Sequence, residues 1–245
     1  MRILSLVLVI TFLAGCKQAE PQLSVQEIVD NSIADSGGKL FASKQVRFSF
    51  RDREYTSEPD NGKKVLKRTT LTDSLQIRDV KTHNGFQRFF NDSLIALPDS
   101  VANRYANSVN SVHYFVRLPL GLNDPAVHKS LLGEVEIGTE SYYKVKVTFS
   151  EANGGEDFDD VYVYWFNKKT FKPDFLAYEF HVNGGGIRFR EAYNERYVNG
   201  IRFVDYNNYR PKIKTYDNVL KTDSLFLNKG LDLLSKIELK QIEVE

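Results

Sequence analysis

Apolar residues near the start of the folded part recur at a helical spacing. Ser24 has the character of an N-cap, with Glu27 three residues later as in a capping box, and Gly37-Gly38 can end the helix. The sequence therefore predicts a short amphipathic helix that begins after Ser24, with one apolar face made of Val25, Ile28, Val29 and Ile33.

After this helix the period changes to two, which is typical of half-buried strands. Apolar and polar residues alternate over residues 46–51, 143–149 and 201–203. Asn-Gly pairs adopt the positive φ values that tight hairpins need, so they predict an antiparallel meander. These pairs are Asn61-Gly62, Asn84-Gly85, Asn153-Gly154, Asn183-Gly184 and Asn199-Gly200.

Residues 161–166 are apolar or aromatic on both sides of the expected strand, so we expect both of its faces to be covered. A helix predicted over residues 99–117 is the candidate cover, because Val101, Tyr105, Val109, Val112 and Val116 recur at helical spacing. The fold class that follows is α+β and mostly β. We expect a strongly curved antiparallel sheet, an open half-barrel, with helices covering its concave side.

The C-terminal part allows two interpretations. Residues 225–237 can form either a helix or two short strands around Asn228-Lys229-Gly230, and we favour the strands. Charged residues then protect the last sheet edge from further pairing, namely Glu238, Lys240 and Glu243.

The N-terminus has the features of a bacterial lipoprotein signal. Arg2 precedes an apolar stretch that is too short to span a bilayer, and the small residues Ala14 and Gly15 stand before Cys16. We expect residues 1–15 to be a signal peptide, residues 16–23 a lipidated cysteine with its tether, and residues 24–245 a single half-barrel domain. The alternatives are an uncleaved anchor and a secretory signal with a chance cysteine.

Net charge and cysteine content further limit the possible partners and cellular location of the protein. Without residues 1–15, which include Arg2 and no acid, the chain has 32 basic and 32 acidic residues, which disfavours nucleic acid as a partner. Acyl chains on Cys16 would hold such a neutral chain at a membrane, and the folded part has no cysteine left for a disulfide. We expect a lipid-anchored protein of the bacterial cell envelope, at the outer membrane and facing the periplasm.

No motif for a cofactor or for serine or P-loop chemistry occurs, and we expect no cofactor. Four histidines, at 83, 113, 128 and 181, lack metal-ligand spacing, so we expect surface or turn positions. Asp157, Asp159 and Asp160 offer oxygen ligands to calcium but lack EF-hand spacing. We therefore expect a solvated hairpin tip there and no metal.

One set of apolar residues can line a single face of the bent sheet. Ordinary core packing is the base-rate interpretation, and a hydrophobic ligand cavity between sheet and helix is the functional one. The candidate ligand-binding residues are Phe48, Phe50, Val145, Val147, Phe149, Trp165, Phe180, Phe189 and Phe203.

Charged residues of the later strands have two interpretations as well. Glu179, Glu191 and Asp205 occur near Arg188, Arg190 and Arg202, a pattern typical of cross-strand ion pairs on an outer face. The alternative is a polar cleft in which Arg188, Arg190, Tyr193 and Asp205 converge.

Four segments resemble an uncharacterised lipoprotein family of Bacteroidota, for which no activity is established. They are residues 107–115 (NSVNSVHYF), 118–127 (LPLGLNDPAV), 160–167 (DVYVYWFN) and 184–194 (GGGIRFREAYN). More loosely, the pattern from Tyr162 to Asn167, with Thr170, Pro173, Phe180 and Asn199-Gly200-Ile201, is similar to the sheet of periplasmic lipoprotein carriers. That resemblance implies an open half-barrel that binds acyl chains between sheet and helices, and it assigns no binding residue.

Three functions remain open from the sequence. The first is a non-enzymatic binding or trafficking module that holds an apolar small molecule or a lipidated partner, which predicts an apolar pocket under residues 99–117. The second is an envelope enzyme or sugar-binding lipoprotein with a polar pocket and buried carboxylates. The third is a structural or interaction lipoprotein without a ligand.

Overall fold

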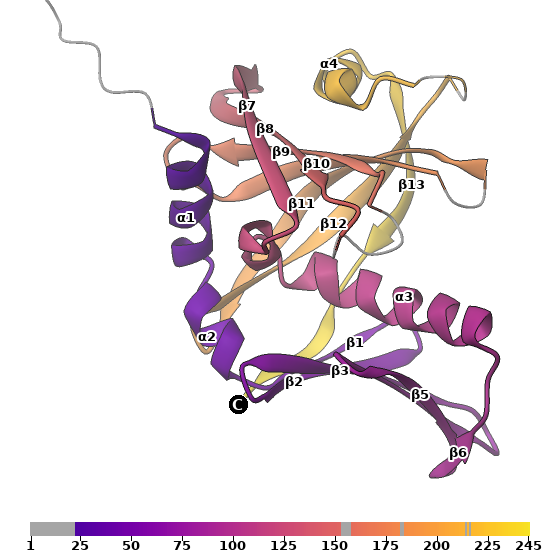
Figure 1. Cartoon of the computed structure of the whole chain (residues 1–245). Coiled ribbons are helices and arrows are strands. Elements are labelled where there is room, and N and C mark those ends of the chain that lie inside the picture. Colours follow the sequence, from indigo (N-terminus) through magenta and orange to yellow (C-terminus); the bar gives the residue numbers. More distant parts are fainter. Residues whose placement is uncertain (1–22, 153–157, 182–183, 214, 216) are drawn as a thin grey trace, which may run out of the picture.

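The strands of the protein form two seven-stranded antiparallel sheets (Figure 1). The computed structural model describes residues 23–152, 158–181, 184–213, 215 and 217–245. The predicted signal peptide, Cys16 and nearly all of the tether lie outside these residues. Both sheets remain open, so the expected class, a mostly β half-barrel with helices, is confirmed, although two sheets replace the single one expected.

Sheet A contains the N-terminal hairpins and the last strand of the chain. Its order is β14-β1-β2-β3-β4-β5-β6. The Asn61-Gly62 turn joins β2 to β3 with positive φ at both residues, as predicted for a tight hairpin. The strands are β1 (Val46–Phe50), β2 (Arg53–Asp60), β3 (Lys63–Leu71), β4 (Gln76–Thr82), β5 (Gly85–Phe90), β6 (Ser93–Ile95) and β14 (Lys240–Val244).

Sheet B is a meander in chain order from β7 at one edge to β13 at the other. The Asn199-Gly200 turn joins β11 to β12, again with positive φ at both residues. The strands are β7 (Val127–Ile137), β8 (Glu140–Phe149), β9 (Val161–Asn167), β10 (Pro173–Phe180), β11 (Gly186–Val198), β12 (Ile201–Pro211) and β13 (Leu231–Ile237).

The two predicted helices, α1 and α3, begin and end close to the positions predicted, and two shorter helices, α2 and α4, accompany them. Helix α1 (Val25–Asp35) has the predicted capping box between Ser24 and Glu27, and Gly37 adopts a left-handed conformation before α2 (Gly38–Ser43). Helix α3 (Asp99–Val116) lies between the two sheets and is followed by the turn η1 (Leu120–Asn123) (Figure 1). Near the C-terminus, the turn η3 (Val219–Lys221) leads into α4 (Thr222–Leu227).

The interpretation of residues 225–237 as two strands is only half correct. Residues 225–227 end helix α4, whereas β13 follows from Leu231. Phe226 explains the difference, because its ring stacks on Phe189 at 4.9 Å and contacts Phe175 at 5.5 Å. Burial of this ring against sheet B outweighs the weak local preference for strand.

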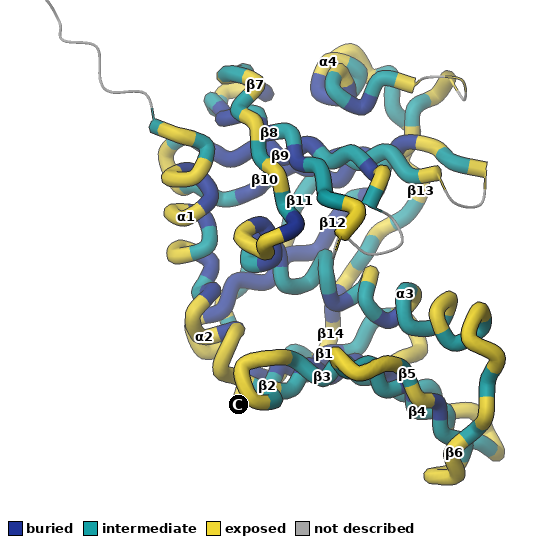
Figure 2. Tube along the Cα trace, in the orientation of Figure 1, coloured by how far each residue is buried: buried dark blue, intermediate teal, exposed yellow. Residues whose placement is uncertain are grey.

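Sheet B is covered on both faces, as predicted for residues 161–166 (Figure 2). Tyr164 and Phe166 belong to the core on the side of α1 and α3, whereas Val163 and Trp165 belong to the core on the side of α4. The hydroxyl groups of Tyr114 on α3 and Tyr164 lie 3.0 Å apart. The C-terminal end of α3 therefore covers the tyrosine face of β9, which confirms the predicted cover.

Helix α3 is attached to sheet A by a buried polar network. Asp79 accepts hydrogen bonds from Arg68 at 2.6 Å and from Arg88 at 2.7 Å, and all three side chains are buried. Arg68 also donates to Ser108 of α3 at 2.8 Å, and Arg88 stacks 3.4 Å over the ring of Tyr105. The network thereby fixes the helix on the sheet and sets its distance from sheet B.

The chain passes from sheet B to sheet A between β13 and β14, at Glu238-Leu239. The buried carboxylate of Asp205 accepts from the backbone N–H of Leu239 at 2.9 Å and from Arg196 at 2.9 Å. Arg196 also donates to the carbonyl of Leu239 at 2.8 Å. This clamp joins the two sheets at one corner of the half-barrel.

Candidate ligand-binding pocket

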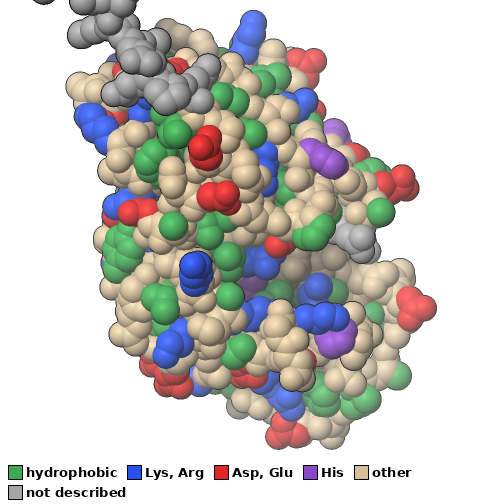
Figure 3. Space-filling view, turned by 60° about the vertical axis from the view of Figure 1, so that its left-hand side comes forward, with side chains coloured by type: hydrophobic (Ala, Val, Ile, Leu, Met, Phe, Trp, Pro, Cys, Tyr) green, Lys and Arg blue, Asp and Glu red, His purple; other side chains and the backbone are tan. Residues whose placement is uncertain are grey.

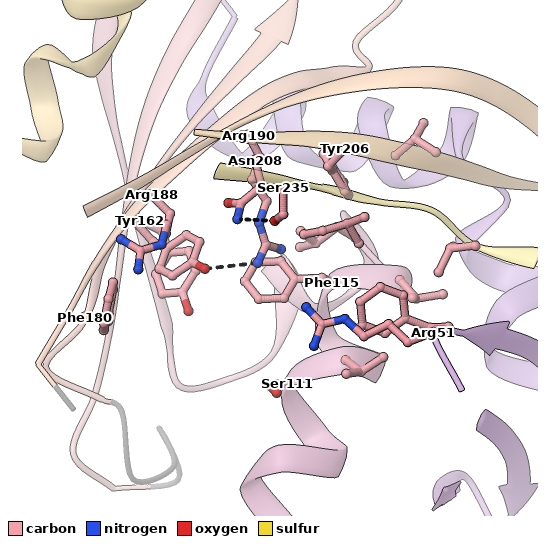
Figure 4. A pocket seen from close by; sticks show the side chains of 18 of the residues that line it. Arg51, Ser111, Phe115, Tyr162, Phe180, Arg188, Arg190, Tyr206, Asn208 and Ser235 are labelled. Atoms are coloured by element: carbon pink, nitrogen blue, oxygen red, sulfur yellow. Dashed lines mark hydrogen bonds between the residues drawn. The ribbon is translucent and has the colours of Figure 1, made fainter. Parts of the chain in front are cut away.

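A pocket of about 390 Å³ lies between the C-terminal half of α3 and the concave face of sheet B (Figure 4). Ser111, Val112, Phe115 and Val116 of α3 contribute to one wall, and strands β9 to β13 form the opposite wall. Seen from the side of α1 and α2, the surface is hollowed between its upper and lower parts, and Lys and Arg side chains surround the hollow (Figure 3). The predicted position under residues 99–117 is therefore correct.

Aromatic rings make up much of the wall. Tyr162 of β9 and Tyr178 of β10 stack at 5.3 Å, and Phe115 packs against Tyr178 at 5.5 Å. Phe180 continues the row at 6.1 Å from Tyr178, and Phe50 lines the pocket from the end of β1. Such a wall is suited to hydrocarbon, with a few hydroxyl groups for orientation.

Two tyrosines of this wall, Tyr162 and Tyr206, are held in the neutral form. Burial raises the pKa of Tyr162 well above its ordinary value and also raises the pKa of Tyr206. Their hydroxyl groups therefore act as hydrogen-bond donors and acceptors without charge. Acid–base chemistry from these phenols is disfavoured accordingly.

Four arginines and one carboxylate also line the pocket. The carboxylate is Asp160, and the arginines are Arg51, Arg188, Arg190 and Arg202. Arg202 is neutralised by Glu195 at 2.7 Å and Asp174 at 3.7 Å. Among the described residues, Arg51, Arg188 and Arg190 have no carboxylate oxygen within 4.0 Å, so the described lining carries excess positive charge.

Arg190 is the buried one of these three cations, with 8% of its surface exposed. Its guanidinium lies 3.7 Å from the centre of the Phe115 ring and donates a hydrogen bond to the Tyr178 hydroxyl at 3.0 Å (Figure 4). Directly opposite in the sheet, Asn208 donates to the Ser235 hydroxyl at 3.1 Å. These contacts place a polar row on the floor of an otherwise aromatic pocket.

The nine predicted ligand-binding residues do not share one face. Phe50 and Phe180 line the pocket. Val145, Val147 and Phe149 lie in the core on the α1 side, Trp165 and Phe189 lie on the α4 side, and Phe48 and Phe203 lie in a third cluster near α2. Because both faces of sheet B are covered, alternation alone cannot tell which apolar face borders the pocket.

The charged residues also differ from both interpretations. Arg188 and Arg190 line the pocket, whereas Tyr193 donates to Glu238 at 2.9 Å and Asp205 belongs to the clamp at Leu239. The four residues therefore do not converge. The expected outer-face ion pairs are wrong for Arg190, since its side chain points to the concave side.

The acidic loop borders the pocket through Asp160. Asp159, Asp160 and His181 bring one ligand atom each within 4.8 Å of one another, while Asp157 lies outside the described residues. His113 corrects the expectation of surface histidines. It is buried edge-on against the stacked rings of Phe48 and Tyr55, and burial lowers its pKa to about 4.

Several pocket residues escaped sequence analysis, above all Phe115 and Asn208, and Arg190 was considered only for outer-face ion pairs or for a polar cleft. In β11, Ile187 and Phe189 alternate with Arg188 and Arg190, a pattern that marks the arginine face as solvent-exposed. Here the apolar face packs under η3 and α4 instead, and the arginines line the pocket. One feature of the sequence could have indicated this arrangement. Residues 161–166 are apolar or aromatic on both sides, so both faces of the sheet that contains them must be covered.

The two open sheets with α1 and α3 on the concave side form an open half-barrel, and this fold is similar to LolA-like half-barrels. The LolA superfamily protein NE2245 from Nitrosomonas europaea is similar, with a TM-score of 0.50, 13% identity and coverage of 91% of this chain and 94% of that chain. A DUF1329 family protein from Desulfovibrio piger has a TM-score of 0.52, 11% identity and coverage of 90% and 93%.

The chain belongs to the family described as "Family of unknown function (DUF6503)", which matches residues 41–239. No curated protein sequence matches the chain. Among the described residues, every helix is too short or too polar to cross a membrane.

Proposed function

We propose that this protein is a lipid-anchored, non-enzymatic binding module of the bacterial cell envelope. Its half-barrel holds an apolar ligand, either a free lipid or an acyl chain of a lipidated partner, between α3 and sheet B. The single observation that carries the proposal is the aromatic pocket of about 390 Å³ under the C-terminal half of α3.

The size and lining of the pocket support this role. Its volume falls in the lower part of the range of roughly 300–1,000 Å³ for small-molecule sites. The rings of Phe115, Tyr162 and Tyr178 supply large apolar surfaces that desolvate a hydrocarbon chain. Each buried methylene would add about 0.8 kcal/mol to binding.

The lining argues against an envelope enzyme or a sugar-binding protein. Acid–base chemistry on a sugar or ester commonly uses two carboxylates, and Asp160 is the one carboxylate among the described lining residues. The nearby buried acid, Asp205, is committed to Arg196 and the backbone of Leu239. A structural lipoprotein without a ligand, in turn, leaves the pocket under α3 without a role.

The anchor rests on the sequence of the N-terminus. We propose cleavage before Cys16, acylation of its thiol and a tether over residues 16–23, which would keep the domain at the outer membrane facing the periplasm. The resemblance of residues 107–115 and 184–194 to a lipoprotein family of Bacteroidota supports this placement.

Filling the pocket tests the proposal. Val112→Trp introduces an indole from α3 into the pocket, whereas Asn103→Trp places the same side chain on an exposed position of the same helix. We expect Val112→Trp to weaken binding of the neutral dye N-phenyl-1-naphthylamine at least tenfold and Asn103→Trp to leave it unchanged. Equal binding by both variants would contradict the proposal, and thermal unfolding checks that both are folded.

A further inference from the structure

We infer that the ligand of this pocket is an amphiphile whose anionic oxygen head group binds Arg190, with its single hydrocarbon tail along the aromatic wall. The inference rests on the proposed function, because it names the chemical class of the ligand held there. It arises from polar atoms on the floor of the pocket that the protein itself leaves without partners.

The polar atoms form a row across three strands. Arg190 of β11 is paired in register with Asn208 of β12, which is paired with Ser235 of β13. All three side chains line the pocket and lie near one another in the close view (Figure 4). A head group that contacts one member of the row can therefore reach the next.

Two groups in this row are incompletely satisfied. Among the described residues, the Nε of Arg190 has no acceptor and the Oδ1 of Asn208 has no donor, although both atoms are fully buried. Exchanging the amide oxygen and nitrogen of Asn208 leaves one of them unpaired all the same, because Ser235 engages the other. A buried polar group without a partner destabilises the protein, so a ligand that supplies a partner to this row is favoured over one that does not.

Charge points to an anion rather than a neutral head group. Arg190 carries a guanidinium, and its described partners, the Tyr178 hydroxyl and the Phe115 ring, leave its positive charge uncompensated. Arg188 lies on the same face two residues earlier, about 7 Å away along the strand. It stacks on Phe180 at 4.8 Å, so two guanidinium groups border one end of the apolar wall.

The volume of the pocket limits how many hydrocarbon chains the ligand can place in it. A volume of about 390 Å³ suits one chain lying along Tyr162, Tyr178 and Phe180, but a bundle of several acyl chains would require α3 to move away from sheet B. A carboxylate and a phosphate monoester present the same anionic oxygens to arginine. The shared chemistry is therefore an anionic oxygen head on one alkyl chain.

Competition between chains of equal length tests the inference. Native mass spectrometry of the full chain, released from detergent micelles, is carried out with equimolar hexadecanoate, hexadecyl phosphate and hexadecan-1-ol. We expect at least one of the anions to be bound at least tenfold more than the alcohol. If more hexadecanoate than hexadecyl phosphate is bound, the natural head group is a carboxylate. If more hexadecyl phosphate is bound, it is a phosphate.

Two variants assign the preference to Arg190. We expect Arg190→Gln to abolish the preference for the anions over the alcohol, and thermal unfolding shows whether the variant is folded. Arg104→Gln removes the same charge from an exposed position of α3 and should retain the preference. If Arg190→Gln binds none of the three chains, Arg188→Gln serves as the second variant, with a reduced preference expected.

The outcomes separate the two proposals. Equal binding of anions and alcohol by the unmodified protein overturns the head-group inference and leaves the proposed function intact. Failure to bind any of the three chains contradicts the proposed function itself. A preference that survives both Arg190→Gln and Arg188→Gln also overturns the inference, since another group would then bind the head.

Discussion

The guanidinium of Arg190 lies over the ring of Phe115, at 3.7 Å from its centre, and so joins the floor of the pocket to the helix above it. Phe115 also packs on Tyr178, whose hydroxyl accepts a hydrogen bond from Arg190. These three side chains hold the C-terminal end of α3 over sheet B. One cation therefore links the floor of the pocket to the position of α3.

This contact should be measurable as a coupling free energy. Phe115→Leu and Arg190→Gln, combined in a double-mutant cycle of chemical unfolding, should give a coupling of about 1 kcal/mol, since partly buried cation–π pairs contribute roughly 0.5–2 kcal/mol. Phe115→Leu with Arg104→Gln should be additive, because Arg104 is exposed elsewhere on the helix. Additivity in both cycles would mean that the contact does not stabilise the fold.

The network under α3 predicts a large difference between two aspartates of sheet A. Asp79→Ala leaves Arg68 and Arg88 buried without their carboxylate and should lower the free energy of unfolding by about 3–5 kcal/mol. Asp92→Ala, which removes an exposed partner of Arg78, should cost at most about 1 kcal/mol. Urea titration of both variants measures the difference, and similar costs would show that the network does not hold α3.

His113 predicts a loss of stability in weak acid. Burial lowers its pKa to about 4 in the folded state, against about 6.5 in the unfolded chain. Between these values the unfolded state binds the extra proton, so the stabilisation is complete above about pH 6.5 and decreases as the pH falls towards 4. From pH 7.5 to pH 5, we expect this group to account for a loss of about 2 kcal/mol.

Comparison of two histidine variants isolates this effect. His113→Gln should flatten the pH dependence of the unfolding free energy by about 2 kcal/mol over this interval, whatever its own stability. His83→Gln, at an exposed turn, should keep the slope of the unmodified protein. An unchanged slope in His113→Gln would contradict the assignment.

The proposed anchor predicts a change in cell fractionation. Cys16→Ser removes the thiol that would carry the lipid, so the protein should move from the membrane fraction to the soluble fraction or keep its signal peptide uncleaved. In both cases the N-terminal peptide of the variant carries no acyl chains. Mass spectrometry detects this as a missing mass relative to the unmodified protein. Membrane association with an unchanged N-terminal mass would contradict lipidation.

Much of the fold follows from the sequence because its signals are local. The capping box at Ser24 and Glu27 forms as predicted, and the turns at Asn61-Gly62 and Asn199-Gly200 have the predicted backbone. The two-sided burial of residues 161–166 implied a cover, and α3 provides it on the tyrosine face. Local geometry and burial suffice for these elements.

The pocket residues depend on a long-range choice that alternation does not encode. Ile187 and Phe189 identify one apolar face of β11, but packing against Phe226 of α4 decides that this face is turned away from the pocket. Arg190 therefore lies on the concave side and lines the pocket, whereas the alternation in the sequence predicts that it is exposed to solvent. A helix was the less favoured alternative for residues 225–237, because residues 225–227, the part of α4 that falls in this range, carry no clear helical period alone.

Crystals of the full chain soaked with 1-bromohexadecane test the central claim most directly, since this neutral chain needs no head-group contact. The account predicts an anomalous bromine signal, with density for the alkyl chain, inside the pocket bordered by Val112, Phe115 and Phe180. A pocket that stays free of the chain while bromine binds elsewhere, or nowhere, would contradict it.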